Sequence, residues 1–285
     1  MTIIWLLLPV LGWGVLPFAI QLVGGTTKNQ IFGTAVGTLI ASFFVIAVQG
    51  LDISVSNFLL AALAGAFWIA GQLGQYQAYK NIGVSRTMPV TSGLQLIGTS
   101  LIGVLIFGEW STTTARTLGF IGIAMLIIGV FLTSYTENKN NDPERKATQS
   151  YVILVLTTIG YLVYNTIPKA MSTSGLAIFF PESVGMVVAV LAYLAVTRSL
   201  GVIKEAKSWQ NILAGLIFSV AAISYIFSVR YNGVNTAFVV GQVSVVLSTL
   251  GGLIFLKEHK TTRELILTIL GLAIIVGGAV VTTVG

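Results

Sequence analysis

Amide and phenol side chains share one helical face in a segment that is otherwise strongly apolar, residues 56–79. Gln72, Gln75, Tyr76 and Tyr79 are spaced i, i+3, i+4 and i+7, so they would lie on one side of a helix. Amide groups both donate and accept hydrogen bonds, and aromatic rings offer an apolar face. This combination suits a neutral solute that presents both hydroxyl groups and C–H surfaces, such as a sugar.

Similar polar positions interrupt four other apolar segments. They are Ser92, Gln95 and Thr99; Tyr161, Tyr164 and Asn165; Ser224, Tyr225 and Ser228; and Gln242 and Thr249. Each either hydrogen-bonds between helices, at about 0.6–2 kcal/mol per bond, or lines a polar cavity. The cavity interpretation selects ten binding candidates, with the two tryptophans as stacking surfaces: Trp13, Trp68, Gln72, Gln75, Tyr76, Ser92, Gln95, Tyr164, Asn165 and Gln242.

One carboxylate stands inside an apolar segment. Glu182 follows Pro181, and at 1.5 Å of rise per residue it lies roughly 9 Å from the start of the segment near residues 176–197. A partly buried carboxyl group can carry a proton. Lys169 ends the preceding apolar segment on the same side, so Glu182 is expected to pair with Lys169, to carry a proton, or to do both.

The sequence lacks the side-chain sets of an enzyme or a metal site. It has no cysteine and a single histidine, His259, and the apolar segments contain no paired carboxylates and no nucleophile–base pair. We therefore expect no catalytic activity, no metal and no cofactor.

The elements that must position these residues are membrane-spanning helices. Charged residues make up 8% of the chain, against about 25% in soluble domains, and the mean hydropathy is +0.92. The first apolar run has no basic residues before it, so it is interpreted as a retained span rather than a secretory signal. Runs long enough to cross a bilayer occur near residues 3–23, 31–49, 56–79, 87–107, 114–134, 151–168, 176–197, 209–229, 236–256 and 262–283. The expected fold is an all-α membrane protein with ten transmembrane helices, in contact with the lipid bilayer.

A polar segment that contains a proline, residues 135–150, divides the ten spans into five and five. It is expected to be a cytoplasmic linker between two repeats, 1–134 and 151–285. Positions match between the halves at a nearly constant offset: Lys80, Gly83 and Val84 with Arg230, Gly233 and Val234, and Glu109, Gly122 and Gly129 with Glu258, Gly271 and Gly278. Because each half has an odd number of spans, the second enters the membrane in the opposite direction. Such inverted repeats are typical of transporters.

The basic residues predict the orientation. Twelve of the 15 Lys and Arg residues fall in connections on the side of the linker, and three, Arg116, Lys169 and Arg230, on the other. The positive-inside rule then places both termini outside the cell. The same residues form no basic cluster, so the net charge of +6 is interpreted as setting orientation and not as binding nucleic acid.

Four motifs are more distinctive than these patterns. They are GWGVLP at 12–17, GQ at 71–72, VSRTMPVTSGLQLIGTSLIGV at 84–104 and QVSVVLSTLGGLIFLKEHKT at 242–261. Through them the chain resembles the bacterial glucose/ribose porter family of the drug/metabolite transporter superfamily. The resemblance implies an inverted-repeat carrier of the bacterial plasma membrane that takes up a monosaccharide, ribose or glucose, in symport with protons. The family usually has Gln where this chain has Lys169 and Glu182, and their opposite charges favour an ion pair between them.

Two other functions are compatible with these features. The superfamily also contains exporters, so the substrate could be another neutral metabolite or an amino acid that leaves the cell. A sensor that does not transport would bind sugar but show no flux in proteoliposomes.

Overall fold

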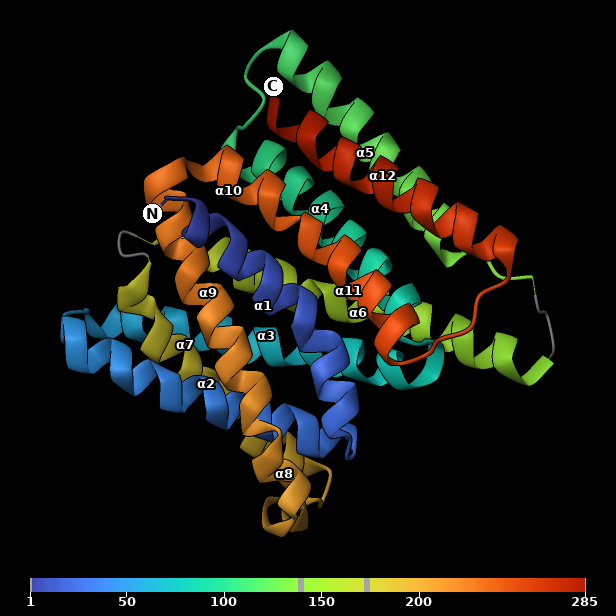
Figure 1. Ribbon diagram of the computed structural model, residues 1–285. Coiled ribbons are helices and arrows are strands. Elements are labelled where there is room, and N and C mark those ends of the chain that lie inside the picture. The colour runs from blue at the N-terminus through green and yellow to red at the C-terminus, as the bar shows by residue number, and fades with distance from the viewer. Residues whose placement is uncertain (1, 138–140, 172–174, 285) are drawn as a thin grey trace.

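The computed structural model describes residues 2–137, 141–171 and 175–284, and in this part of the chain it contains all ten expected spans as helices (Figure 1). The first half comprises α1 (Thr2–Val23), α2 (Thr27–Gln49), α3 (Val55–Ile82), α4 (Val84–Phe107) and α5 (Thr113–Ser134). The second comprises α6 (Asn141–Ala170), α7 (Leu176–Val196), η1 (Leu200–Lys204), α8 (Ala206–Gln210), α9 (Ile212–Asn232), α10 (Val234–Gly241), α11 (Val243–Phe255) and α12 (Thr262–Val284).

Short polar caps and glycines set the ends of these helices. Thr26 caps α2 through a reciprocal pair of bonds with Asn29, and Thr112 caps α5 by accepting from the backbone N–H of Ala115. Gly83 and Gly233 stand immediately before α4 and α10 with φ of 84° and 82°, a backbone conformation that favours glycine. The connections on either side of these glycines are therefore abrupt, and the next helix starts at once.

The start of α1 and the end of α12 lie at one end of the helical bundle, and the end of α5 and the start of α6 lie at the other (Figure 1). We call these ends the termini side, where α1 begins and α12 ends, and the linker side, where α5 ends and α6 begins. Large apolar side chains such as Phe44, Leu105 and Phe131 are more than 70% exposed on the outer surface. An apolar exterior of this kind suits contact with lipid.

Helices of the two halves pack against each other in exchanged pairs. Here α1, α2, α3 and α4 are matched in chain order with α6, α7, α9 and α11. Under this matching the α3–α6 contact corresponds to α1–α9, the α3–α7 contact to α2–α9, and the α4–α6 contact to α1–α11. α5 and α12 lie side by side along one edge of the bundle (Figure 1). Most of the core is therefore built between the halves rather than within either one.

Glycines allow the closest of these contacts. A Cβ added at Gly122 would lie 2.8 Å from the carbonyl oxygen of Gly278, and one added at Gly129 would lie 2.8 Å from that of Gly271. The α5 and α12 backbones thus touch at two levels, as small residues permit between membrane helices. The sequence offset matches Gly122 with Gly271 and Gly129 with Gly278. If each glycine is replaced by its match, the Gly122–Gly278 contact becomes the Gly129–Gly271 contact, and the reverse.

Two local features differ from what the sequence suggests. The Gly12–Gly14 motif could break the first span, but α1 is continuous and Gly12 instead admits Ala221 of α9, whose Cβ would lie 2.7 Å from an added Cβ. The break occurs in the ninth span, where Gln242 separates α10 from α11. In addition, α6 begins at Asn141, inside the expected linker.

Candidate functional site

The most deeply buried polar cluster joins α3 to α6 and α4. The hydroxyl of Tyr161 lies 2.5 Å from Oε1 of Gln72 and also contacts Oε1 of Gln75. The amide nitrogen of Gln75 donates to Oη of Tyr79 at 2.6 Å and to Sδ of Met88 at 3.0 Å. Because a tyrosine hydroxyl carries one proton, only one of the two glutamine oxygens can accept it at a time. The other is left available to a hydroxyl donor.

Glycine makes room for this cluster on α3. A Cβ added at Gly71 would lie 2.8 Å from the ring of Tyr161, so the ring rests directly on the α3 backbone. This contact explains the Gly71–Gln72 pair in physical terms: glycine admits the ring, and glutamine meets its hydroxyl. On the same helix Tyr76 is fully buried, and its Oη lies 3.0 Å from Oγ1 of Thr34 in α2.

A second set of candidates is more accessible. Ser92 and Gln95 on α4, Tyr164 and Asn165 on α6, and Gln242 are all half-buried. α4 packs on both α6 and α11, so these helices adjoin. Every predicted amide residue in the two sets therefore lies on α4, on α6 or next to them on a helix that packs against one of the two.

Gln242 occupies the break between α10 and α11. Its backbone N–H lies 3.2 Å from the carbonyl oxygens of both Phe238 and Val239, and its Nε2 is 3.4 Å from the oxygen of Phe238. Irregular backbone at membrane depth is tolerated where protein or a cavity surrounds it, and broken helices commonly frame transporter sites. The Gln242 backbone keeps helical dihedral angles, with φ −64° and ψ −21°, and its N–H is already bonded, so its side chain is the part suited to a ligand.

The two predicted stacking residues have different surroundings. Trp13 is half-buried and packs on Tyr225 with ring centroids 5.2 Å apart. An added Cβ at Gly241 would lie 3.9 Å from both rings, so this aromatic pair adjoins the helix break. Trp68 is only 4% exposed and packs on Phe218 at 4.7 Å. Trp13 is the better stacking surface of the two.

The expected ion pair between Lys169 and Glu182 is wrong. Lys169 is exposed at the end of α6, and its Nζ lies 2.9 Å from Oε1 of Glu109, beyond the end of α4. Glu182 is 5% exposed in α7, where the hydroxyl of Tyr164 donates to its Oε2 at 3.5 Å. Among the described residues, no cationic side chain lies within 4.0 Å of Glu182. The pairing failed because Lys169 turns toward water at the helix end whereas Glu182 points into the bundle.

Charged groups gather on the linker side instead. Oε1 and Oε2 of Glu258, after α11, accept from the backbone N–H groups of Val84 at 2.6 Å and Ser85 at 2.9 Å. Arg86 lies 3.6 Å from Glu264 at the start of α12. These bonds tie the first turn of α4 to α11 and α12.

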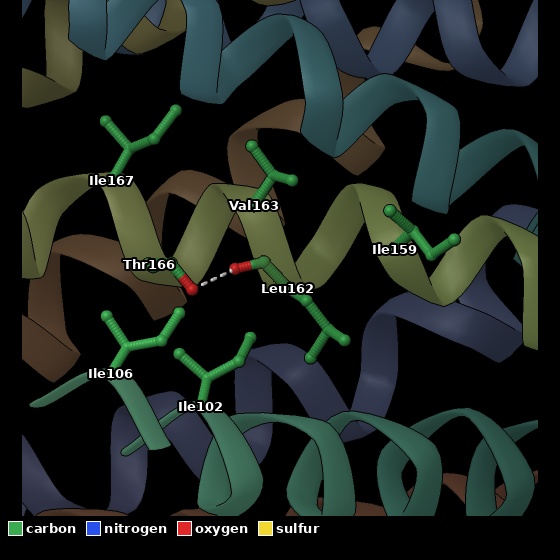
Figure 2. A pocket seen from close by; sticks show the side chains of 7 residues that line it. All are labelled: Ile102, Ile106, Ile159, Leu162, Val163, Thr166 and Ile167. Carbon is green, nitrogen blue, oxygen red and sulfur yellow. Dashed lines mark hydrogen bonds between the residues drawn. The ribbon is translucent and has the colours of Figure 1, made fainter. Parts of the chain in front are cut away.

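A hollow of about 320 Å³ lies between α4 and α6 (Figure 2). It is lined by Ile102, Ile106, Ile159, Leu162, Val163, Thr166 and Ile167. Its one hydroxyl, on Thr166, is turned back to the carbonyl oxygen of Leu162 at 2.6 Å, as Figure 2 shows. Such a lining offers no partner to sugar hydroxyls, so this hollow is not the sugar site.

Sequence reasoning found the polar faces but not all of their members. Tyr161 and Tyr225 stand in the predicted stripes, yet neither was among the ten binding candidates. Met88 and Thr34 were missed entirely, because a thioether and a lone threonine in an apolar run give no signal of their own. The i, i+3, i+4 spacing of Tyr161 with Tyr164 and Asn165 was the available signal.

Comparison with known proteins agrees with this picture. The profile of the sugar transport protein family matches residues 4–284. A protein of Lactobacillus johnsonii, whose name assigns it provisionally to sugar uptake, is 50% identical over 99% of both chains. One of Latilactobacillus sakei, provisionally named for ribose uptake, is 37% identical over 97% of this chain and 96% of its own.

A protein of known crystal structure shares the fold. Its TM-score is 0.65, and the match covers 99% of this chain and 97% of that one, at 14% identity. At this identity the likeness concerns the fold alone. The family profile and the relatives, which span nearly the whole chain, carry the assignment: this protein belongs to the sugar transport protein family.

Proposed function

We propose that this protein takes up a monosaccharide, ribose or glucose, across the bacterial plasma membrane in symport with protons. The observation that carries the proposal is the amide and phenol cluster, in which Gln72 and Gln75 compete for the single proton of Tyr161. A sugar hydroxyl that donates to the unoccupied oxygen would satisfy a group that the ligand-free protein leaves unpaired. The cluster contains no fixed charge, which suits a neutral substrate.

The other candidates complete the binding site around this cluster. Ser92, Gln95, Asn165 and Gln242 provide half-buried polar groups, and Trp13 with its neighbour Tyr225 provides an apolar surface for the C–H face of the ring. Tyr76 and Trp68 are packed against Thr34 and Phe218. Their proposed role is to hold α3 in place behind the residues that touch sugar.

Alternating access follows from an inverted repeat. The exchanged helix pairs and the reciprocal Gly122–Gly278 and Gly129–Gly271 contacts support two five-helix repeats related by a pseudo-two-fold axis. Rocking of one repeat against the other would expose the central site to each side in turn. The excess of Lys and Arg on the linker side supports a cytoplasmic linker and termini outside the cell.

Glu182 is the proposed proton carrier. An ionisable side chain inside a membrane span without a cationic partner is usually functional. The Tyr164 hydroxyl joins Glu182 to α6, next to Asn165, so a change in protonation would be felt beside the sugar. Lys169, held by Glu109 at the helix end, has no part in this step.

Uptake of labelled sugar by proteoliposomes tests the proposal, with ribose and glucose as competitors and with or without an inward proton gradient. Gln75→Ala should lower uptake at least tenfold, whereas Gln77→Ala, an exposed glutamine on the same helix, should leave it near wild type. Unchanged uptake in the Gln75 variant would remove the cluster from the site.

Coupling is tested with Glu182→Gln, the neutral isostere of the glutamate, and the control is Asp52→Asn, which neutralises an exposed acid. The first should abolish stimulation by the gradient while sugar exchange at equal concentrations continues, and the second should change neither. Flux only outward in cells would favour the exporter, and binding without flux the sensor.

A further inference from the structure

On the linker side, a carboxylate caps a helix that belongs to the other half. The first N–H groups of an α-helix lack partners within the helix and carry partial positive charge. Glu258 accepts from two of them at the start of α4, those of Val84 and Ser85. Gly83 makes this possible, because a Cβ there would lie 2.8 Å from Cδ of Glu258. We call Glu258 together with Gly83 and the first turn of α4 the linker-side latch.

The same parts exist on the termini side. Gly233 precedes α10 with φ 82° and ψ 158°, close to the 84° and 165° of Gly83 before α4. Glu109 follows α4 as Glu258 follows α11. Its backbone N–H donates to the oxygen of Gly103 at 3.0 Å, as that of Glu258 donates to Gly252 at 3.3 Å. The glycines are 150 residues apart and the glutamates 149, so the two loops are built alike.

On the termini side, however, the parts are not assembled. Nothing lies within 4 Å of a Cβ added at Gly233, and Val234 is 62% exposed. In the part of the chain that the structure describes, no carboxylate accepts from the N–H of Val234. Glu109 holds Lys169 instead, and both side chains are about half exposed, at 47% and 51%. An exposed ion pair of this kind is weak and easily exchanged.

We propose that Glu258 and Glu109 are alternating latches that decide which side of the transport pathway is closed. In this structure Glu258 caps α4, so the linker side is closed, and Glu109 is withdrawn to Lys169, so the termini side is open. In the opposite state Glu258 leaves α4, and Glu109 leaves Lys169 to accept from the first N–H groups of α10 beside Gly233. The inference rests on the alternating access proposed above and adds the residues that set its two end states.

Distances between spin labels test the latches directly, and the absence of native cysteine makes labelling simple. Asn81→Cys with His259→Cys reports the linker side, and Ser111→Cys with Tyr231→Cys reports the termini side; all four positions are exposed or lie at helix ends. Without sugar, the wild type should show a short linker-side distance. Glu258→Gln should raise the population with a long linker-side distance about tenfold and shorten the termini-side distance. Glu109→Gln should do neither.

A linker-side distance that Glu258→Gln leaves unchanged would overturn the proposal, and so would equal responses to the two glutamine variants. Glu258→Asp keeps the charge and should restore part of the short distance. This rescue separates latching from general damage to the fold.

Three glycine variants test the latch that is open in this structure. Gly233→Ala and Gly50→Ala impose similar backbone strain, at φ 82° and 73°, and neither added methyl has a neighbour within 4 Å. Both lie on the termini side, but only Gly233 would meet a carboxylate in the opposite state. Gly233→Ala should slow sugar uptake at least fivefold more than Gly50→Ala, and Gly83→Ala should slow it as much as Gly233→Ala. Equal uptake in the Gly233 and Gly50 variants would refute the Glu109 latch.

The outcomes separate this inference from the proposed function. If the label distances shift as expected but no sugar is moved, the latches stand and sugar uptake is wrong. If sugar is moved but the distances do not respond to Glu258→Gln, sugar uptake stands and the latches are wrong.

Discussion

The two ends of the bundle are built from similar sequence but are held very differently. On the linker side, the carbonyl groups at the end of α1 and just after it accept from side chains at 2.7–3.0 Å. Lys207 donates to the oxygen of Val23, Lys80 to that of Gly25 and Asn211 to that of Gly24. Glu258 and Glu264 add bonds from the other half of the chain. On the termini side, the one ion pair among the described residues is the exposed Lys169–Glu109 pair. Matching loops therefore do not give matching stability; under the proposed alternating latches, the loop that is engaged would change with the state of the transporter.

The largest expected effect compares the two latch glutamates. Glu258→Ala leaves the N–H groups of Val84 and Ser85 without acceptors and removes two charge-assisted bonds, which should destabilise the protein by about 3 kcal/mol. Glu109→Ala removes an exposed pair and should change stability by less than about 1 kcal/mol. Thermal unfolding in detergent measures both. Equal losses would mean that the two ends are held alike.

Lys260 lies on the linker side and should make the stability of this end depend on pH. It lies in the loop between α11 and α12, near Arg86, Glu264 and Glu258, and burial together with the Arg86 charge lowers its pKa from 10.5 to about 8. The unfolded chain therefore binds more protons than the folded one between pH 8 and 10.5, so stability rises with pH across that window. At pH 7 Lys260 is charged in both states, and its burial opposes folding.

Lys260→Met should accordingly raise the melting temperature at pH 7, by an amount equivalent to about 2 kcal/mol at most, even though it removes the Nζ bond to Thr268. The gain should shrink as the pH rises from 8 toward 10. Melting curves of both proteins at several pH values measure this. A difference that is independent of pH would show that Lys260 is not buried as described.

The smallest effect compares the cationic partners of Glu264 and Glu109. Arg86→Ala removes the partner of the buried Glu264 and should cost about 1–2 kcal/mol, whereas Lys169→Ala should cost about 0.5 kcal/mol. The same melting assay at low and high salt distinguishes them, because only the exposed pair is strongly screened. If salt changed the stability loss of the Arg86 variant but not that of the Lys169 variant, then Arg86–Glu264 would be the exposed pair and Lys169–Glu109 the buried one.

The sequence predicted the spans well because crossing a bilayer demands about 20 apolar residues, whatever those residues pack against. It also located the polar stripes, since Gln72, Gln75 and Tyr161 repeat with the helical period. It could not pair the side chains across helices. Lys169 was matched with Glu182 because the two opposite charges were expected on the same side of the membrane, and the structure joins Lys169 to Glu109 instead.

Breaks in helices were equally hard to predict. Glycine at Gly12–Gly14 and at Gly241 gives the same local signal, but only packing tells them apart. Ala221 occupies the space beside Gly12, so α1 remains helical, whereas the chain at Gln242 is interrupted. Local sequence offers the possibility of a break, and the neighbouring helix decides whether it occurs.

The shared proton of Tyr161 has a thermodynamic consequence. Without ligand, the hydroxyl has two acceptors, the oxygens of Gln72 and Gln75, and so two arrangements of similar energy. A bound sugar that donates to one oxygen fixes the hydroxyl on the other and removes this degeneracy, an entropic loss of about 0.4 kcal/mol (RT ln 2, with RT about 0.59 kcal/mol) that the added hydrogen bond outweighs. Replacing either glutamine with leucine would fix the proton in advance, so calorimetry should then find a smaller enthalpy of binding and a less unfavourable entropy.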